Sequence, residues 1–289
     1  MKKPFFGLLL AILSLAVCAQ APTNAPVSEE MPALPTVNAS FAAKYAIYAM
    51  VASNTYHKNE RERVHFPIEL LGWQQVDLND QPTTKATGTR KSGLAWDVYE
   101  KKDSNEVIFS FRGTDSRGDY ITSSAMPWPL AIQYRQARHN FEKYQAAHPD
   151  KHITLTGHSL GGGLAAGLSV RKGVDTVVFD PSPRIFDGWG DKHLPAKTRI
   201  VIFQKGEVLE KVRKVWPKLV KTFERESFYM TEFDFKEFNA HRMDQLALGL
   251  VYLGGLESSD LVAVAEAIRG KIPAASDAAI AETVGKRPQ

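Results

Sequence analysis

One short segment constrains the fold more than any other, because it places a glycine-rich turn between a strand-like and a helix-like stretch. Residues Ile153–Thr156 are apolar or β-branched and run directly into the heptapeptide GHSLGGG at 157–163, after which Leu164–Leu168 has a helix-forming composition. Glycines on both sides of a serine allow a sharp turn, because side chains there would collide with the neighbouring strand and helix. The segment therefore predicts a buried strand that ends in a strained turn and continues as a helix.

The same turn has the residue types of a catalytic site. Gly157-His158-Ser159-Leu160-Gly161 follows the pattern G-x-S-x-G, which in a strand–turn–helix context exposes the serine as a nucleophile. The backbone N–H of Leu160 would stand at the helix start and could stabilise a developing oxyanion. A phosphate-binding loop is the competing interpretation, but neither the lysine of G-x-x-x-x-G-K-[ST] nor the spacing G-x-G-x-x-G is present. Ser159 is the candidate nucleophile and Leu160 a candidate oxyanion donor.

Short apolar segments and helical segments alternate through the middle of the chain. Helical patterns cover 131–147 and 164–171, and a further helix is expected from Ser40, with Ser40 as its N-cap. This alternation predicts an α/β protein with a doubly wound, mostly parallel sheet and flanking helices. Together with the G-x-S-x-G turn, it indicates the α/β-hydrolase fold. After residue 205 the pattern is mostly helical. The expected strands are Leu94–Tyr99, Val107–Phe111, Ile153–Thr156, Val174–Phe179 and Arg199–Phe203.

The first residues have the character of an export signal. Lys2 and Lys3 precede an apolar run that is too short to cross a bilayer, and cleavage after Ala19 would satisfy the small-residue pattern. We expect a signal peptide at 1–19, a flexible linker at 20–39, the hydrolase-like domain at 40–275 and a C-terminal tail at 276–289. The mature protein would be periplasmic or secreted. The alternative is a lipoprotein anchored at Cys18.

Composition excludes several other classes of protein. Cys18 is the only cysteine, so cleavage after Ala19 leaves no thiol for a disulfide, a nucleophile or a metal ligand. The net charge is +4, and it falls to +2 when Lys2 and Lys3 are removed with the signal peptide. A weakly basic chain of mixed charge is not typical of a nucleic-acid-binding protein, and we expect no nucleic-acid partner.

A second glycine-containing turn lies one strand and one helix before the serine. The segment Phe109-Ser110-Phe111-Arg112-Gly113-Thr114-Asp115 is a strand that breaks at Gly113. In the α/β-hydrolase arrangement the second oxyanion N–H comes from such an early strand-to-helix loop, which makes Thr114 the second candidate donor. An ordinary turn with Thr114 or Asp115 capping a helix is the alternative.

These two motifs resemble those of a known family. FRGT at 111–114, followed about 45 residues later by GHSLGG at 157–162, resembles the class 3 (fungal-type) lipases and their bacterial relatives, and SPR at 182–184 is similar to a turn of that family. The resemblance is strongest from about 94 to 207. It implies a lipase-like hydrolase with a Ser–acid–His triad, the histidine lying near the C-terminal end.

The resemblance and the chain order of this fold point to the other two triad members. The expected acid position follows the strand 199–203 and holds Glu207, where the family usually has aspartate; Asp180, at the end of the preceding strand, is the runner-up. His241, at the start of a late amphipathic helix, is the expected base. His158 is expected to point away from the base position. His139, His148, His152 and His193 are expected to be solvated.

These residues predict an exported serine carboxylic-ester hydrolase, a lipase or phospholipase that acts through an acyl-enzyme intermediate. A soluble esterase for small acyl groups and an inactive envelope-binding module are the alternatives. No cofactor and no metal are expected, because no histidine–carboxylate cluster has zinc-ligand spacing. An apolar surface-loop candidate within 116–133 would either contact lipid or pack against the core. A basic, aromatic segment at 205–238 is typical of a solvated helix, with contact to an anionic membrane surface as the alternative. The oligomeric state is left open.

Overall fold

The computed structural model describes residues 34–57, 63–114, 127–183, 194–210, 223–234 and 241–271. The main compact unit begins at Leu34. The expected signal peptide, most of the expected linker and the expected C-terminal tail lie outside the described residues. In the described part, no helix is long and apolar enough to cross a membrane.

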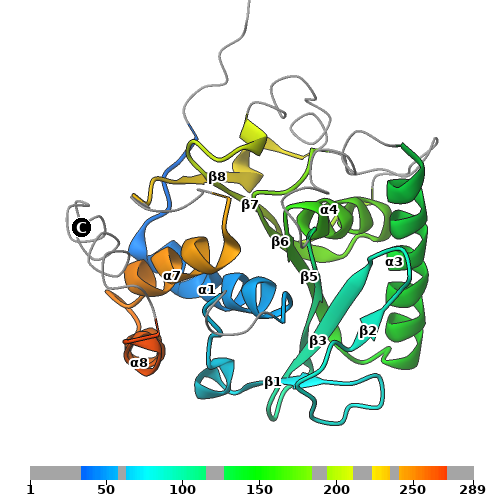
Figure 1. Cartoon of the computed structure of the whole chain (residues 1–289), viewed down its shortest axis with the longest axis horizontal. Coiled ribbons are helices and arrows are strands. Elements are labelled where there is room, and N and C mark those ends of the chain that lie inside the picture. Colours follow the sequence, from blue (N-terminus) through cyan, green and yellow to red (C-terminus); the bar gives the residue numbers. More distant parts are fainter. Residues whose placement is uncertain are drawn as a thin grey trace, which may run out of the picture. The chain divides into compact units, whose positions relative to one another are not determined.

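A mixed, mostly parallel sheet forms the centre of the domain (Figure 1). Its strands run in the order β1-β3-β4-β5-β6-β7-β8, and β2 pairs with the first two residues of β3, Ala95 and Trp96. The pairs β1–β3 and β3–β4 are antiparallel, and every pair from β4 to β8 is parallel. The strands are β1 (Trp73–Val76), β2 (Gly88–Thr89), β3 (Ala95–Lys101), β4 (Glu106–Phe111), β5 (His152–His158), β6 (Asp175–Phe179), β7 (Arg199–Gln204) and β8 (Phe228–Thr231).

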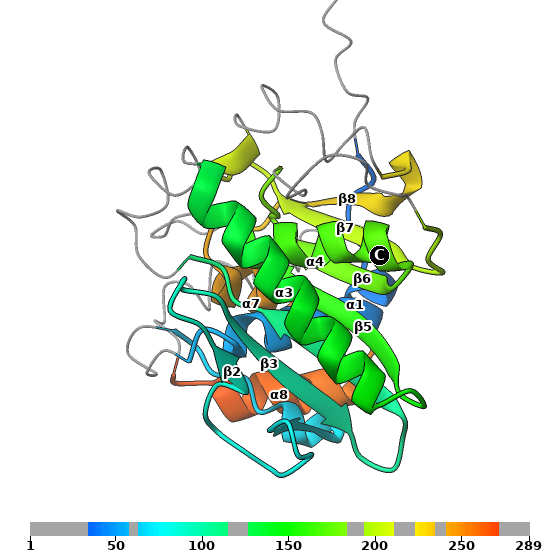
Figure 2. The same cartoon turned by 90° about the vertical axis from the view of Figure 1, so that its right-hand side faces the viewer.

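Helices cover both faces of this sheet. Because β4, β5 and β6 follow one another in sequence and in space, right-handed crossovers put α3 (Pro127–Ala147) and α4 (Leu160–Lys172) on the same face (Figures 1 and 2). The other face is covered by helices from the two ends of the domain, α1 (Ala39–Asn54) and α7 (Met243–Gly254), with α8 (Ser259–Ile268) beside α7. The 3₁₀ turns are η1 (Ile68–Leu71) and η2 (Arg225–Ser227).

Strand alternation divides the core into two apolar clusters, one on each face. In β4, Val107 and Phe109 pack with the residues of α3 and α4, whereas Ile108 packs with those of α1 and α7. All three side chains are at most 1% exposed. Burial on both faces explains why the central strands have continuous apolar sequences, and why the five expected strands are all confirmed.

The folded domain starts earlier than the sequence suggests. Thr36 forms a parallel bridge with Met230, the N–H of Val37 donates to the Met230 carbonyl at 3.0 Å, and Val37 is 2% exposed. Asn38, rather than Ser40, caps α1, because its side chain accepts the N–H of Phe41 at 2.8 Å. Residues 35–37, within the segment expected as a linker, therefore contact β8, and Asn38 and Ala39 begin α1.

Two further expectations differ from the structure. The region after 205 is not wholly helical, because β8 extends the sheet; its short, half-exposed sequence carries a weak strand pattern. The apolar segment expected as a surface loop begins α3 at Pro127, a position that a helix tolerates because the first N–H has no helical acceptor. Residues 116–126 of that segment lie outside the described residues.

Candidate active site

The turn between β5 and α4 is a strained elbow centred on Ser159. Ser159 has φ 57° and ψ −124°, a backbone conformation that residues other than glycine rarely adopt. A Cβ on Gly161 would lie 2.1 Å from the Phe111 carbonyl oxygen, and one on Gly157 would lie 2.6 Å from the Gly161 carbonyl carbon. Both glycines are therefore required by close backbone approach, as the sequence pattern predicts.

The loop after β4 lies directly against the serine. A Cβ on Gly113 would lie 2.6 Å from the His158 carbonyl oxygen and 3.2 Å from the Cβ of Ser159. Thr114 is the next residue along this loop and is half-buried. On the other side, Leu160 is the first residue of α4, and the helical hydrogen bonds begin with Gly163 N–H donating to the Ser159 carbonyl at 3.0 Å. Thr114 therefore follows the glycine that packs against Ser159, and Leu160 follows Ser159 itself.

The structure brings Glu207 and His241 together. Nδ1 of His241 lies 2.7 Å from Oε2 of Glu207, and this carboxylate oxygen also accepts the N–H of Leu209 at 2.8 Å. The Glu207 side chain is fully buried and that of His241 is 9% exposed. Glu207 follows β7 and His241 immediately precedes α7, so two separate elements hold the acid and the imidazole in a fixed relation.

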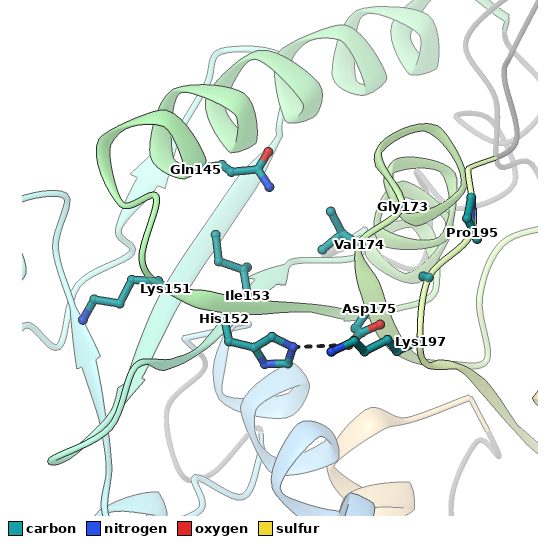
Figure 3. A pocket seen from close by; sticks show the side chains of 10 residues that line it. Gln145, Lys151, His152, Ile153, Gly173, Val174, Asp175, Pro195 and Lys197 are labelled. Carbon is teal, nitrogen blue, oxygen red and sulfur yellow. Dashed lines mark ion pairs between the residues drawn. The ribbon is translucent and has the colours of Figure 1, made fainter.

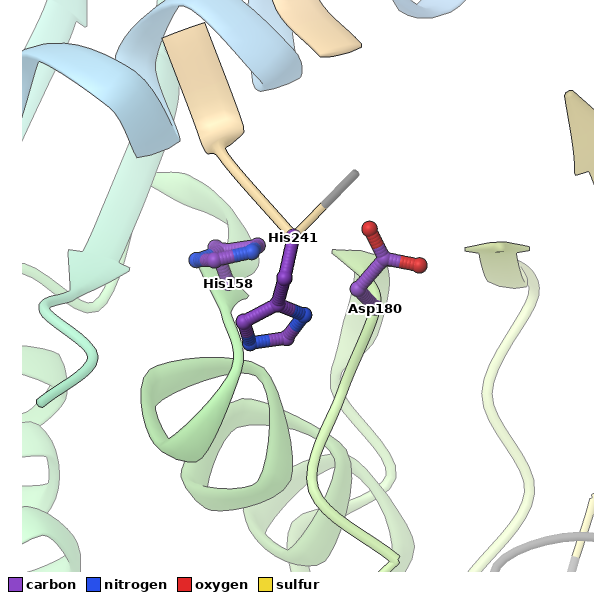
Figure 4. Close-up of side chains that lie close together, drawn as sticks. All are labelled: His158, Asp180 and His241. Atoms are coloured by element: carbon purple, nitrogen blue, oxygen red, sulfur yellow. The ribbon is translucent and has the colours of Figure 1, made fainter. Parts of the chain in front are cut away.

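Asp180 lies close by but has a different hydrogen-bond partner. It ends β6 with φ 40°, is 1% exposed, and its Oδ1 accepts the N–H of Gln204 at 2.8 Å. This bond connects the ends of β6 and β7. Asp180 also belongs to a group with His158 and His241, in which one nitrogen or oxygen atom from each residue lies within 4.8 Å of the others (Figure 4).

Two residues that the motif analysis did not assign to the site lie in it. The ring of His158 is 4.5 Å from that of His241, centroid to centroid, so the expectation that His158 points away from the base is wrong. Tyr56, near the end of α1, places its hydroxyl 2.7 Å from Nδ1 of His158. No local motif marks Tyr56, because only the packing of α1 on the sheet brings it to the elbow.

Burial determines the protonation of His158. Desolvation, followed by electrostatic interactions with His241 and Arg63, lowers its pKa well below the ordinary value of 6.5. The ring is therefore neutral at physiological pH. Arg63 itself lies over the Tyr56 ring, with its guanidinium carbon 3.9 Å from the ring centroid.

The four histidines expected to be solvated differ in their surroundings. His139 is exposed, and His152 is 54% exposed, as expected. His148 is not solvated: its side chain is 13% exposed, stacks on Tyr144 and lies 3.1 Å from an Asp80 carboxylate oxygen. His193 lies outside the described residues.

A pocket of about 530 Å³ occupies the opposite end of the strands (Figure 3). His152 begins β5 and Asp175 begins β6, and the two side chains, 3.4 Å apart, belong to its lining. Ser159 and Asp180 follow the carboxyl ends of the same strands. Since ligands of open α/β sheets bind outside the carboxyl ends, this pocket is separate from the candidate active site.

Comparison with known proteins agrees with this arrangement. Residues 47–182 match the model of a phospholipase-like family, described as the Tle-like phospholipase domain. The match begins earlier and ends earlier than the resemblance expected from the motifs. It includes Tyr56, Gly113, Ser159 and Asp180 but neither Glu207 nor His241. No curated protein sequence matches the chain.

Several solved lipase structures are similar to the chain at low identity. Lip2 lipase from Yarrowia lipolytica is 16% identical, with 62% of this chain and 76% of that chain covered and a TM-score of 0.42. A lipase from Rhizopus microsporus var. chinensis is 17% identical, with 69% and 79% covered and a TM-score of 0.43. Lipase II from Rhizopus niveus is 15% identical, with 62% and 77% covered and a TM-score of 0.43. Residues 47–182, which contain the serine elbow and the strands β1 to β6, are therefore similar to a phospholipase-like domain, within a mixed, mostly parallel sheet with flanking helices.

Proposed function

We propose that the chain is an exported serine carboxylic-ester hydrolase, a lipase or phospholipase that cleaves lipid acyl esters. The observation that carries the proposal is the combination of a strained Ser159 elbow with the buried contact of 2.7 Å between Glu207 and His241. A nucleophile, a base and a group that orients the base are the three parts required for acyl transfer through a serine.

The reaction follows from the roles of these side chains. His241 takes the proton from the Ser159 hydroxyl while Oγ attacks the ester carbonyl carbon, and the N–H groups of Leu160 and Thr114 stabilise the oxyanion. The intermediate then collapses, the C–O bond to the alcohol breaks, and His241 returns the proton to the departing alcohol. Water, deprotonated by His241, next attacks the acyl-enzyme, releasing the fatty acid and restoring Ser159.

Glu207 is assigned as the acid of the triad. Its carboxylate faces Nδ1 of His241, so it favours the tautomer with Nε2 available as a base and stabilises the imidazolium that forms. Asp180 is the competing assignment. Its hydrogen bond to the backbone of Gln204 supports a role in connecting two strands.

A fluorophosphonate probe separates an enzyme from an inactive binding module. The purified protein should label at Ser159, located by mass spectrometry of the labelled peptide, and the Ser159→Ala variant should not label. Ser169, a buried serine within α4, provides the matched control, and Ser169→Ala should label like the wild type. Absence of wild-type labelling would favour the binding module.

The lipid specificity is tested by comparing substrates. The match to a phospholipase-like domain supports a phospholipid or glyceride substrate and peripheral contact with a membrane. Fatty-acid release from vesicles of phosphatidylethanolamine and phosphatidylglycerol should exceed hydrolysis of p-nitrophenyl acetate or butyrate at equal ester concentration. A preference for the short soluble esters would instead establish the soluble-esterase alternative.

Export is part of the proposal and rests on residues 1–19. Lys2, Lys3 and the following apolar run have the composition of a cleaved signal peptide. The mature N-terminus, determined by mass spectrometry after expression in a Gram-negative host, should begin at Gln20. A mature chain that begins with acylated Cys18, and that becomes soluble on Cys18→Ser, would show a lipoprotein.

A further inference from the structure

A cluster of potential metal ligands overlaps the candidate active site. One nitrogen or oxygen atom from each of His158, Asp180 and His241 lies within 4.8 Å of the others, although the residues are far apart in sequence. Nε2 of His158 is buried and makes no hydrogen bond of standard geometry among the described residues, although the backbone of His241 lies close to the ring. We propose that His158, Asp180 and His241 form a site for a divalent transition metal, Zn²⁺ being the best fit, and that the bound metal reversibly inhibits the hydrolase.

Each of the three side chains has a neighbour that orients it for this role. Tyr56 lies 2.7 Å from Nδ1 of His158, and Glu207 lies 2.7 Å from Nδ1 of His241, so both rings would offer Nε2 to a metal. The backbone N–H of Gln204 bonds Oδ1 of Asp180, which orients the carboxylate. Ligand histidines in zinc sites commonly use their second ring nitrogen in this way, with a carboxylate or another polar group as partner.

The donor set and its dimensions suit zinc. Two imidazoles and a carboxylate are typical zinc ligands, at bond lengths of about 2.0–2.2 Å, which places the ligand atoms about 3.3 Å apart around one tetrahedral ion. The observed upper limit of 4.8 Å requires side-chain rotations that bring the ligand atoms closer together. Three protein ligands leave a fourth position for water. His158 ends β5, Asp180 follows β6 and His241 precedes α7, so no spacing within one motif could reveal the cluster.

Inhibition follows from the position of His241, and this part rests on the proposed function. A metal bound to Nε2 of His241 occupies the lone pair that must accept the Ser159 proton, so the nucleophile is no longer activated. The charge of the ion would also oppose formation of the imidazolium. Removal of the metal by a chelator restores the base.

Metal binding is measured first, without reference to activity. Chelator-treated protein is titrated with ZnCl₂ by calorimetry, and with Co²⁺ by its visible absorption, in a buffer that does not bind metals. We expect one ion per chain. Asp180→Asn keeps an oxygen acceptor for the Gln204 N–H and should weaken zinc binding at least tenfold, as should His158→Asn. Unchanged affinity in both variants, with melting temperatures close to that of the wild type, would overturn the site.

The pair of the exposed His152 and the half-buried Asp175 provides the control. Their side chains lie 3.4 Å apart at the opposite end of the strands, and His152→Gln should bind zinc like the wild type. Loss of the bound ion in this variant would place the site there and overturn the proposal.

Inhibition is measured second. Zinc at the concentration that saturates the wild type should abolish labelling of Ser159 by a fluorophosphonate and hydrolysis of lipid esters, and EDTA should restore both. His158→Asn, where it retains activity, should need at least tenfold more zinc for half inhibition. An active enzyme that saturating zinc does not inhibit, or activates, would refute inhibition. A chain that binds zinc at the cluster but never labels would refute the hydrolase function and leave the metal site standing.

Discussion

Nδ1 of His241 lies 2.7 Å from Oε2 of Glu207, although the family resemblance leads one to expect an aspartate at the acid position. The longer glutamate side chain starts from the loop after β7 and is held by the Leu209 N–H at 2.8 Å. The nearby aspartate, Asp180, uses Oδ1 to bond the backbone of Gln204. The contacts of these two carboxylates distinguish their roles and lead to the first prediction.

Glu207→Gln should lower kcat on a lipid ester by about 10⁴-fold with little change in KM, because an amide cannot hold the imidazole in the productive tautomer or stabilise the imidazolium. Asp180→Asn should be much milder in metal-free buffer, because its oxygen still accepts the Gln204 N–H. Glu232→Gln, at an exposed carboxylate paired with Lys205, should be silent. Steady-state kinetics check all three. A large loss of kcat in Asp180→Asn together with a small loss in Glu207→Gln would reverse the assignment of the acid.

Replacing Ser159 should separate catalysis from backbone strain. Ser159→Ala and Ser159→Gly should each lower kcat by about 10⁶-fold. The glycine variant should nevertheless be about 1 kcal/mol more stable than the alanine variant, because glycine adopts φ 57°, ψ −124° without steric cost. Chemical denaturation measures the difference.

Ser169 provides the matched pair for this comparison. It lies within α4, where glycine is less favourable than alanine by about 1 kcal/mol, so the order of stability should be reversed there. Finding Ser159→Gly no more stable than Ser159→Ala would contradict the strained elbow.

Gly161→Ala should destabilise the domain by about 3 kcal/mol, since the added methyl group would lie 2.1 Å from the Phe111 carbonyl oxygen and force β4 and α4 apart. Gly255→Ala is the control, because its Cβ would meet its nearest neighbours at 3.3 Å at an ordinary helical φ of −61°. It should change stability by less than about 0.5 kcal/mol. Urea unfolding followed by circular dichroism checks both, and equal stabilities would argue against the close approach.

His57 should make stability depend on pH. Its Nε2 lies 2.6 Å from an oxygen of the buried Asp97, and this hydrogen bond raises the pKa of His57 above 6.5 against the opposing effect of burial. A raised folded-state pKa stabilises the protein fully below the unfolded value of about 6.5, and the gain is lost as pH rises through the folded pKa. The loss in unfolding free energy caused by His57→Gln should therefore be larger at pH 5.5 than at pH 9.

The exposed His152, near Asp175, is the control for this dependence, and His152→Gln should show a smaller change across the same pH range. A His57→Gln effect that is constant from pH 5.5 to 9 would show that the pair with Asp97 does not depend on protonation.

The sequence by itself determined the elements whose signals are local. Central strands buried on both faces have continuous apolar sequences, and the glycines at 157 and 161 are dictated by steric contact within one turn, so the sheet, the elbow and Ser159 could be predicted from residues adjacent in the chain. The strands β1, β2 and β8 are at most four residues long, which is too short for an apolar run or an alternating pattern to give such a signal.

Tertiary structure alone decided which distant side chains meet. Parallel strand order brings the ends of β5, β6 and β7 to one edge of the sheet, and the packing of α1 and α7 on one face adds Tyr56 and His241 to that edge. No local pattern encodes this convergence, because it depends on the crossovers between elements. Chain order and the family resemblance led to Glu207 and His241 as partners, whereas the proximity of His158 to both His241 and Asp180 follows from the fold and from no motif.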